Sequence, residues 1–184
     1  VGIDVPDYDE ALKTLMRQDP DVVFVGEMRD AETVTAAMRA AETGHLVFGT
    51  MHSADASQSV QRLLDLFPQV ERDLVRQTLS LTIRAIISQR LMPSIKEDID
   101  RVPVVDILIG NGTARKLISD GREADLPQLI KNSQNEGMQD FTTNLCQLVQ
   151  DGTIDPKEAY KYAPNKEELK MALKGIKTSS SGLV

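Results

Sequence analysis

Two polar side chains that can do chemistry follow apolar stretches of this sequence. Glu27 comes after "VVFV" (22–25) and Gly26, and His52 comes after "HLVFGTM" (45–51), with Ser53 next to it. A carboxylate there can hold a hard metal ion or orient a water, and an imidazole at a neighbouring strand end can sense a phosphate. Ligands of open α/β sheets bind beyond the carboxyl ends of the strands, so the position of both residues depends on the elements around them.

The two apolar stretches are predicted to be neighbouring parallel strands. The run 22–25 does not alternate with polar residues, which is typical of a strand covered on both faces. Residues 30–43 between the stretches are predicted to be a helix, with Asp30 as N-cap and Gly44 just past its end. A strand–helix–strand unit makes a parallel pair, so Glu27 and His52 are expected at one edge of the sheet.

The rest of the first 110 residues continues the alternation of helix and strand. Apolar spacing predicts helices over 8–18 and 55–67, and 70–92 is expected to be the longest helix. "VPVVDILIG" (102–110) is predicted to be a third strand. This order indicates an α/β fold with a parallel or mixed sheet between helices. After Gly112 only helices are predicted, over 113–119, 124–135, 138–151, 155–163 and 165–174.

Composition excludes several classes of protein. The 184 residues carry a net charge of −7, which disfavours nucleic acid or an anionic lipid surface as a general partner. No apolar run approaches the roughly 20 residues of a membrane helix. The one cysteine, Cys146, rules out an internal disulfide or a CxxC metal clip, and a reducing cytoplasm is the simplest context.

An apolar strand that ends in an acid is the Walker B pattern of P-loop NTPases, and by itself this pattern is common. The longer string "DPDVVFVGEMRDAETVTAAMRAAETGHLVFGTMHSADA" (19–56) strongly resembles the secretion and type IV pilus motor ATPases. Its first part stands for their Walker B region, and "TGHLVFGTMHS" stands for their His box. Together with "EGMQDFTTNLCQLVQDGTI" (136–154), it is most similar to the retraction, or twitching-motility, branch, the PilT type.

The resemblance implies the C-terminal part of a RecA-like three-layer P-loop NTPase domain, followed by a helical appendage. The partial core is expected over 1–110, the helical subdomain over 111–176 and a flexible tail over 177–184. The family uses ATP and Mg²⁺ and forms a ring of six identical subunits. Its partner is the inner-membrane platform of the pilus, so the resemblance implies a cytoplasmic protein at the inner face of the membrane. Neither nucleic acid nor a membrane span is expected.

Roles carry over from the family by matching residues. Glu27 takes the place of the Walker B acid, which holds Mg²⁺ through water, and His52 takes the place of the residue that reads the phosphate. These two are the predicted catalytic residues, and Gly26, Arg29 and Ser53 are the predicted cofactor-binding positions. Arg29 is also expected to pair with a nearby acid and help to anchor the turn into the next helix.

Simpler roles remain open for the same residues. Glu27 can interact with the dipole of helix 30–43, and His52 can be a loop histidine bonded to a carbonyl. His45 precedes the second strand at its other end and is expected to be structural. The helix at "TARKLISD" (113–120) keeps only Arg115, Leu117 and Ile118 of the "AIRNLIRE" of the retraction branch.

No G-x-x-x-x-G-K-[ST] phosphate loop occurs in the sequence. In the family this loop lies upstream of the Walker B region, so the chain is expected to be the C-terminal part of a longer protein. Such a segment is expected to bind ATP poorly and not to hydrolyse it. Two alternatives to a retraction motor stay open: a pilus assembly or type II secretion motor, and a non-catalytic interaction module derived from one.

Overall fold

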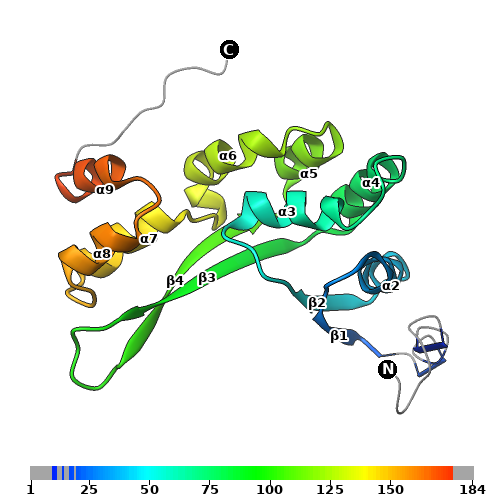
Figure 1. The fold of residues 1–184 in the computed structure, drawn as a ribbon, viewed down its shortest axis with the longest axis horizontal. Coiled ribbons are helices and arrows are strands. Elements are labelled where there is room, and N and C mark those ends of the chain that lie inside the picture. Colours follow the sequence, from blue (N-terminus) through cyan, green and yellow to red (C-terminus); the bar gives the residue numbers. More distant parts are fainter. Residues whose placement is uncertain (1–9, 12–13, 15–16, 19, 176–184) are drawn as a thin grey trace. The chain divides into compact units, whose positions relative to one another are not determined.

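The computed structural model describes residues 10–11, 14, 17–18 and 20–175 (Figure 1). Its contacts divide these residues into two compact units. The first unit holds the described residues up to Arg84 together with Gly110–Leu126. The second unit holds Ala85–Ile109 and the described residues from Pro127 onward. The division at residue 110 expected from the sequence stays a prediction, as does the tail 177–184, which lies outside the described residues.

A parallel strand pair forms the sheet of the first unit. Strand β1 (Val22–Glu27) pairs with β2 (Leu46–Thr50), and helix α2 (Ala31–Glu42) connects them. The register pairs Val22 with Leu46 and Phe24 with Phe48, and it shifts by one residue between Val25 and Glu27. The predicted strand–helix–strand unit with parallel strands is therefore confirmed.

The described part of the first unit also holds α3 (Ala56–Asp65), α4 (Arg72–Thr82), α5 (Gly112–Ser119) and the 3₁₀ turn η1 (Glu123–Asp125). Their apolar faces supply most of its buried side chains. Among these, Val60 and Leu64 of α3 and Ile118 of α5 are fully buried. The small residues of α2, such as Ala37 and Ala40, are also buried, as expected of an alanine-rich helix that packs closely.

One face of the β1–β2 sheet is open in the described residues. Val22, Phe24, Leu46 and Phe48 alternate along the strands, and Phe24 is 71% exposed. Val23, Val25 and Val47 are half-buried on the other face. The sequence predicted that other elements bury both faces of this strand, because its apolar residues do not alternate with polar ones. Such a run matches the surroundings of the strand in the whole folded protein. The described residues cover only one of these faces.

The second unit is built on an antiparallel hairpin. Strand β3 (Ala85–Pro93) pairs with β4 (Arg101–Ile109), as Figure 1 shows. Its remaining elements are α6 (Leu126–Asn132, all but its first residue), the 3₁₀ turn η2 (Gln134–Glu136), α7 (Phe141–Gln150), α8 (Pro156–Tyr162) and α9 (Lys166–Leu173). Met92 and Val104 of the hairpin pack with Leu145 and Leu169 in one hydrophobic core. None of the helices in the described part of the chain has the length and apolar character that a membrane crossing requires.

The predicted helix over 70–92 is wrong in its second half. Helix α4 ends at Thr82, and residues 85–93 form β3 instead. Ile86 and Ile87 are β-branched, and side chains along β3 alternate between a buried and an exposed face, which suits a strand. Pairing with β4 stabilises the strand, since hydrogen bonds to a partner strand override local helical spacing. The third strand is confirmed at 101–109, but it pairs antiparallel with β3.

The helices predicted after Gly112 are confirmed with small shifts of their ends. The one difference is at 124–135, where α6 is flanked by the two 3₁₀ turns. The helix predicted over 8–18 lies largely outside the described residues.

Candidate active site

The ends of β1 and β2 meet at one edge of the sheet, as parallel neighbours must. Past the register shift, Glu27 pairs with Thr50, and the Met28 amide donates to the Thr50 carbonyl at 2.8 Å. The Thr50 hydroxyl donates to the carbonyl of Gly26 at 3.0 Å. Gly26 is thus the extra residue of a bulge next to the site, where a bulge re-aims the side chain that follows.

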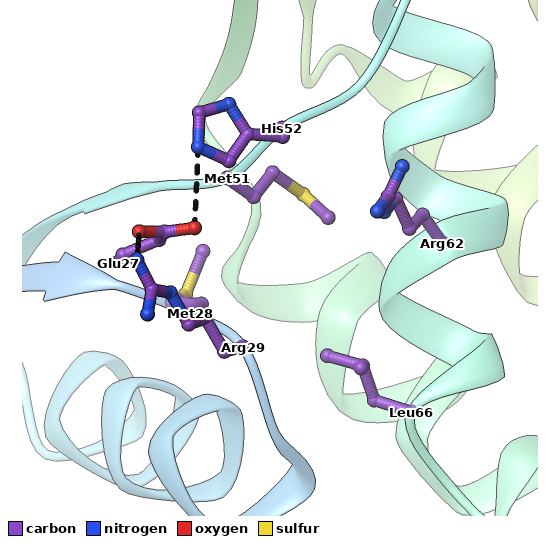
Figure 2. Close-up of a pocket in the computed structure, with 7 residues that line it drawn as sticks. All are labelled: Glu27, Met28, Arg29, Met51, His52, Arg62 and Leu66. Atoms are coloured by element: carbon purple, nitrogen blue, oxygen red, sulfur yellow. Dashed lines mark hydrogen bonds and ion pairs between the residues drawn. The ribbon is translucent and has the colours of Figure 1, made fainter.

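Glu27 and His52 lie in direct contact. His52 Nε2 is 3.2 Å from Glu27 Oε1, and Figure 2 shows the imidazole above the carboxylate. The His52 side chain is 84% exposed and that of Glu27 is 28% exposed, so a ligand from solvent can reach both. The juxtaposition predicted from the strand order is therefore confirmed, while the roles of the two residues stay predictions.

Arg29 binds the other oxygen of the same carboxylate. Its Nη2 donates to Glu27 Oε2, so the nearby acid expected for Arg29 is Glu27 (Figure 2). This hydrogen bond from Arg29 is the main cause of a lowered pKa at Glu27. Partial desolvation opposes the shift, and the charges of Arg29 and His52 add to it. An ordinary glutamate is already ionised at neutral pH, and the lowered pKa keeps this carboxylate ionised further into the acidic range, as a metal-binding or water-orienting role requires.

Asp30 fixes the turn that follows. Its carboxylate accepts hydrogen bonds from the Thr33 amide at 2.8 Å and from the Thr33 hydroxyl at 2.7 Å. It is thus the N-cap of α2, and the two bonds hold the pKa of the Asp30 carboxyl below its usual value. The predicted cap is confirmed, and it sets the direction in which the chain leaves Glu27.

Ser53 and His45 contact neighbouring segments of the chain instead of the pocket. Ser53 does not line the pocket beside Glu27; its hydroxyl lies 2.6 Å from that of Ser59 and ties the loop to α3. His45 is structural, as expected. Its Nδ1 lies 3.0 Å from the carbonyl of Ala40 and 3.1 Å from the hydroxyl of Thr43, so the ring contacts the end of α2.

A pocket of about 280 Å³ opens at these strand ends. This is near the lower limit of ligand pockets, which span roughly 300–1,000 Å³, and it suits a phosphate-sized group better than a whole nucleotide. Both the strand ends and α3 with its C-terminal end contribute polar and apolar side chains to its lining (Figure 2): Glu27, Met28, Arg29, Met51, His52, Arg62 and Leu66.

Arg62 and Leu66 were not predicted from the sequence. They stand four residues apart on α3 and at its end, so they point to the same side. One feature of the sequence could have indicated them. The connection from His52 to α3, which begins at Ala56, is short, so the side chains of α3 stay close to the end of β2. Met28 and Met51 also line the pocket.

The residues of the pocket fit magnesium only as part of a magnesium nucleotide. In the described residues no group of three His, Cys, Asp or Glu side chains stands ready to hold a metal ion. Glu27 is the carboxylate of this pocket. Mg²⁺ in phosphate sites commonly keeps several waters and takes one or two protein carboxylates, its other ligands being phosphate oxygens. A single ionised carboxylate is compatible with that arrangement.

Comparison with known proteins identifies the family. The family model for type II/IV secretion system proteins matches residues 4–174. The chain belongs to this family. A curated relative, the twitching motility protein of Neisseria gonorrhoeae, is 41% identical over 162 residues, covering 88% of this chain and 43% of the relative. The type IV pilus retractation ATPase PilT of Pseudomonas aeruginosa is 40% identical over 156 residues, covering 85% and 45%.

The structures of known family members agree with the sequence comparison. The crystal structure of the pilus retraction motor PilT with bound ADP superposes with a TM-score of 0.77 at 43% identity, covering 92% of this chain and 47% of that one. The fold is thus the C-terminal part of a RecA-like ATPase domain, and the resemblance inferred from the sequence is confirmed. The chain spans less than half the length of these secretion-family relatives.

Proposed function

We propose that the whole protein, of which this chain is a segment, is an ATPase that drives pilus retraction in twitching motility. The proposal is supported by the two curated relatives, one called a twitching motility protein and the other a pilus retractation ATPase. The observation that carries it is the contact between Glu27 and His52 at the ends of two neighbouring parallel strands. This edge is where α/β sheets bind their ligands.

The site residues divide the work as follows. Bound Mg²⁺ would neutralise charge on the phosphates of ATP. The ionised Glu27 carboxylate, positioned by Arg29, would hold that ion through a bound water. The exposed His52 ring, whose Nε2 lies beside Glu27 Oε1, would turn this nitrogen to a phosphate oxygen when ATP is bound and return to Glu27 when that phosphate leaves. Gly26 shapes the strand end, and Ser53 holds the loop that carries His52.

We infer further that the protein works as a homo-oligomer, a ring of six subunits. Closure of one subunit against the next around ATP, and release after loss of the terminal phosphate, would turn hydrolysis into movement. The ring would act from the cytoplasm on the platform protein of the inner membrane. The phosphate loop would come from a part of the protein outside this chain.

Two other functions are alternatives, one of which would use the same catalytic site and one of which would use no catalytic site. A pilus assembly or secretion motor would share Glu27 and His52, and deletion of the gene separates it from a retraction motor. Cells without a retraction motor carry excess pili, whereas cells without an assembly motor carry none. A non-catalytic module would dock on an active relative and have no turnover of its own.

The decisive experiment is ATP hydrolysis by the whole protein with Glu27→Gln. The substitution keeps the size of the side chain and removes its charge. Turnover is expected to fall by roughly 100-fold or more, the order found when one electrostatic group of an active site is removed. A whole protein that hydrolyses ATP equally with and without the substitution would exclude this role of Glu27. A wild-type protein with no turnover would favour the non-catalytic module.

A further inference from the structure

Arg62 is a cation of the pocket that forms no ion pair within the part of the chain that the structure describes. The other arginine of the lining, Arg29, is engaged with Glu27. Figure 2 shows the Arg62 guanidinium extending from α3 toward the side of the pocket where Met51 and His52 lie. Arg62 is exposed, so its donors are open to a ligand.

The end of α3 does not account for Arg62. A basic residue in the last turn can interact with the helix dipole and the last carbonyls. In the structure it is Arg72 that reaches the chain after α3: its Nε donates to the Phe67 carbonyl, just past the C-cap, at 3.1 Å. Asp65, one turn after Arg62, is likewise paired with Arg72 at 2.9 Å and also accepts from Gln61.

The charges of the lining favour an anion. Two arginines and one carboxylate line the pocket, together with an imidazole, although the chain as a whole carries a net charge of −7. A local excess of positive charge in an acidic protein attracts anions to that spot. The guanidinium is a planar fork of donors that matches two oxygens of one phosphate.

We propose that Arg62 binds the terminal phosphate of the nucleotide, opposite the strand ends that carry Glu27 and His52. This rests on the proposed function, because it takes ATP as the ligand. The terminal phosphate is the part of ATP that meets the pocket, since Glu27 and His52 line the same small space. Arg62 is thus assigned as a ligand-binding residue that distinguishes ATP from ADP.

The test measures the binding of a non-hydrolysable ATP analogue and of ADP, each with Mg²⁺, to the whole protein by calorimetry. Arg62→Gln is expected to weaken binding of the ATP analogue by roughly 10- to 100-fold, the loss of a charge-assisted hydrogen bond or two. Binding of ADP is expected to change by less than about threefold. Arg62→Lys, which keeps the charge but loses the fork, is expected to fall between wild type and Arg62→Gln.

The control is Arg84→Gln, which removes the same charge from an exposed arginine of the same unit outside the pocket. It is expected to bind both nucleotides like wild type. Equal affinities for the ATP analogue in wild type and Arg62→Gln would overturn the assignment and leave the proposed function standing. An equal loss for both nucleotides would overturn the terminal-phosphate assignment. A wild-type protein that binds neither nucleotide would overturn the proposed function as well.

Discussion

The guanidinium of Arg29 donates to Oε2 of Glu27 from a position only two residues further along the chain. The contact joins the last residue of β1 to the turn before α2, so both partners are positioned by local structure. It leaves the other oxygen, Oε1, beside His52. Arg29 therefore acts on the site through Glu27, and this can be measured in the 184-residue chain without nucleotide.

Arg29→Gln is expected to raise the pKa of Glu27 toward its ordinary value of 4.5, because the largest cause of the lowered pKa is lost. The lowered pKa also affects stability. A depressed carboxyl pKa stabilises the fold above the unfolded-state pKa, and this contribution is lost as pH falls through the folded-state pKa. The variant should thus lose less stability than wild type on acidification below about pH 4.5. Carboxyl-carbon NMR titration reads the pKa directly.

Arg84→Gln is the matched control for that titration, since it removes an arginine that does not contact Glu27. It should leave the titration of Glu27 in place. If Glu27 titrates at the same pH in Arg29→Gln as in wild type, the hydrogen bond does not set its protonation.

The two histidines of the chain offer a second matched pair. His52→Ala in the whole protein should lower kcat for ATP by roughly 100-fold while nucleotide affinity changes little, as expected when a donor acts mainly in the transition state. His45→Ala removes a histidine bonded to Ala40 and outside the pocket. It should keep kcat and lower only thermal stability. The measurement is steady-state turnover with calorimetric binding.

Loss of turnover in both histidine variants would point to a general folding defect instead of a site effect. Unchanged turnover in His52→Ala would remove this residue from the proposed chemistry. The contact with Glu27 would then be a local interaction between two side chains with no part in turnover.

The elements of the site and the pairing of its two strands could be predicted from the sequence. The pairing of β3 with β4 and the side to which Arg62 points could not. Asp30 and the β-branched run before Glu27 act through neighbours in the chain, so cap, strand and helix were all found. Parallel pairing followed from the right-handed crossover. Strand β3 was missed because its partner, β4, begins after a loop, and apolar spacing alone does not reveal such a partner. Arg62 was missed because the side to which a helix turns depends on packing.

The helix α5 shows a related limit of motif comparison. Residues 113–120 keep three positions of the retraction-branch motif, and each has a structural task here. Leu117 and Ile118 are buried, and Arg115 donates to three carbonyls, those of Gly110, Leu81 and Ile83, at 2.8, 2.9 and 3.1 Å. The retained Arg115 thus holds α5 to the end of α4, while Leu117 and Ile118 belong to the buried side of the helix.

Arg115→Met is therefore expected to destabilise the chain by roughly 2–4 kcal/mol, because carbonyls at the end of α4 lose charge-assisted partners. Urea unfolding followed by circular dichroism measures the change. The neighbouring Lys116→Met serves as control, since Lys116 makes an exposed ion pair with Asp120. Such a pair contributes about 0–1 kcal/mol, so the control should unfold near the wild-type midpoint. Equal midpoints for both variants would show that the carbonyl contacts of Arg115 add nothing.

Arg76 and Glu123 form a largely buried ion pair, and its loss is expected to lower the stability of the fold. Arg76 Nε lies 2.7 Å from Glu123 Oε1, and the side chains are only 17% and 8% exposed. Removing one member of a buried pair leaves an uncompensated charge, so Arg76→Met is expected to cost about 3–5 kcal/mol in unfolding free energy. Replacing both members with apolar residues removes the stranded charge as well as the pair.

The double variant Arg76→Met/Glu123→Leu is accordingly expected to be more stable than Arg76→Met alone, with a coupling of about 1–3 kcal/mol in the double-mutant cycle. Urea unfolding of the four proteins gives this coupling. Strictly additive losses would mean that the two side chains stabilise the fold separately and not through their ion pair. A higher unfolding free energy in the double variant than in Arg76→Met would show that the Glu123 carboxylate destabilises the fold once Arg76 is no longer there to pair with it.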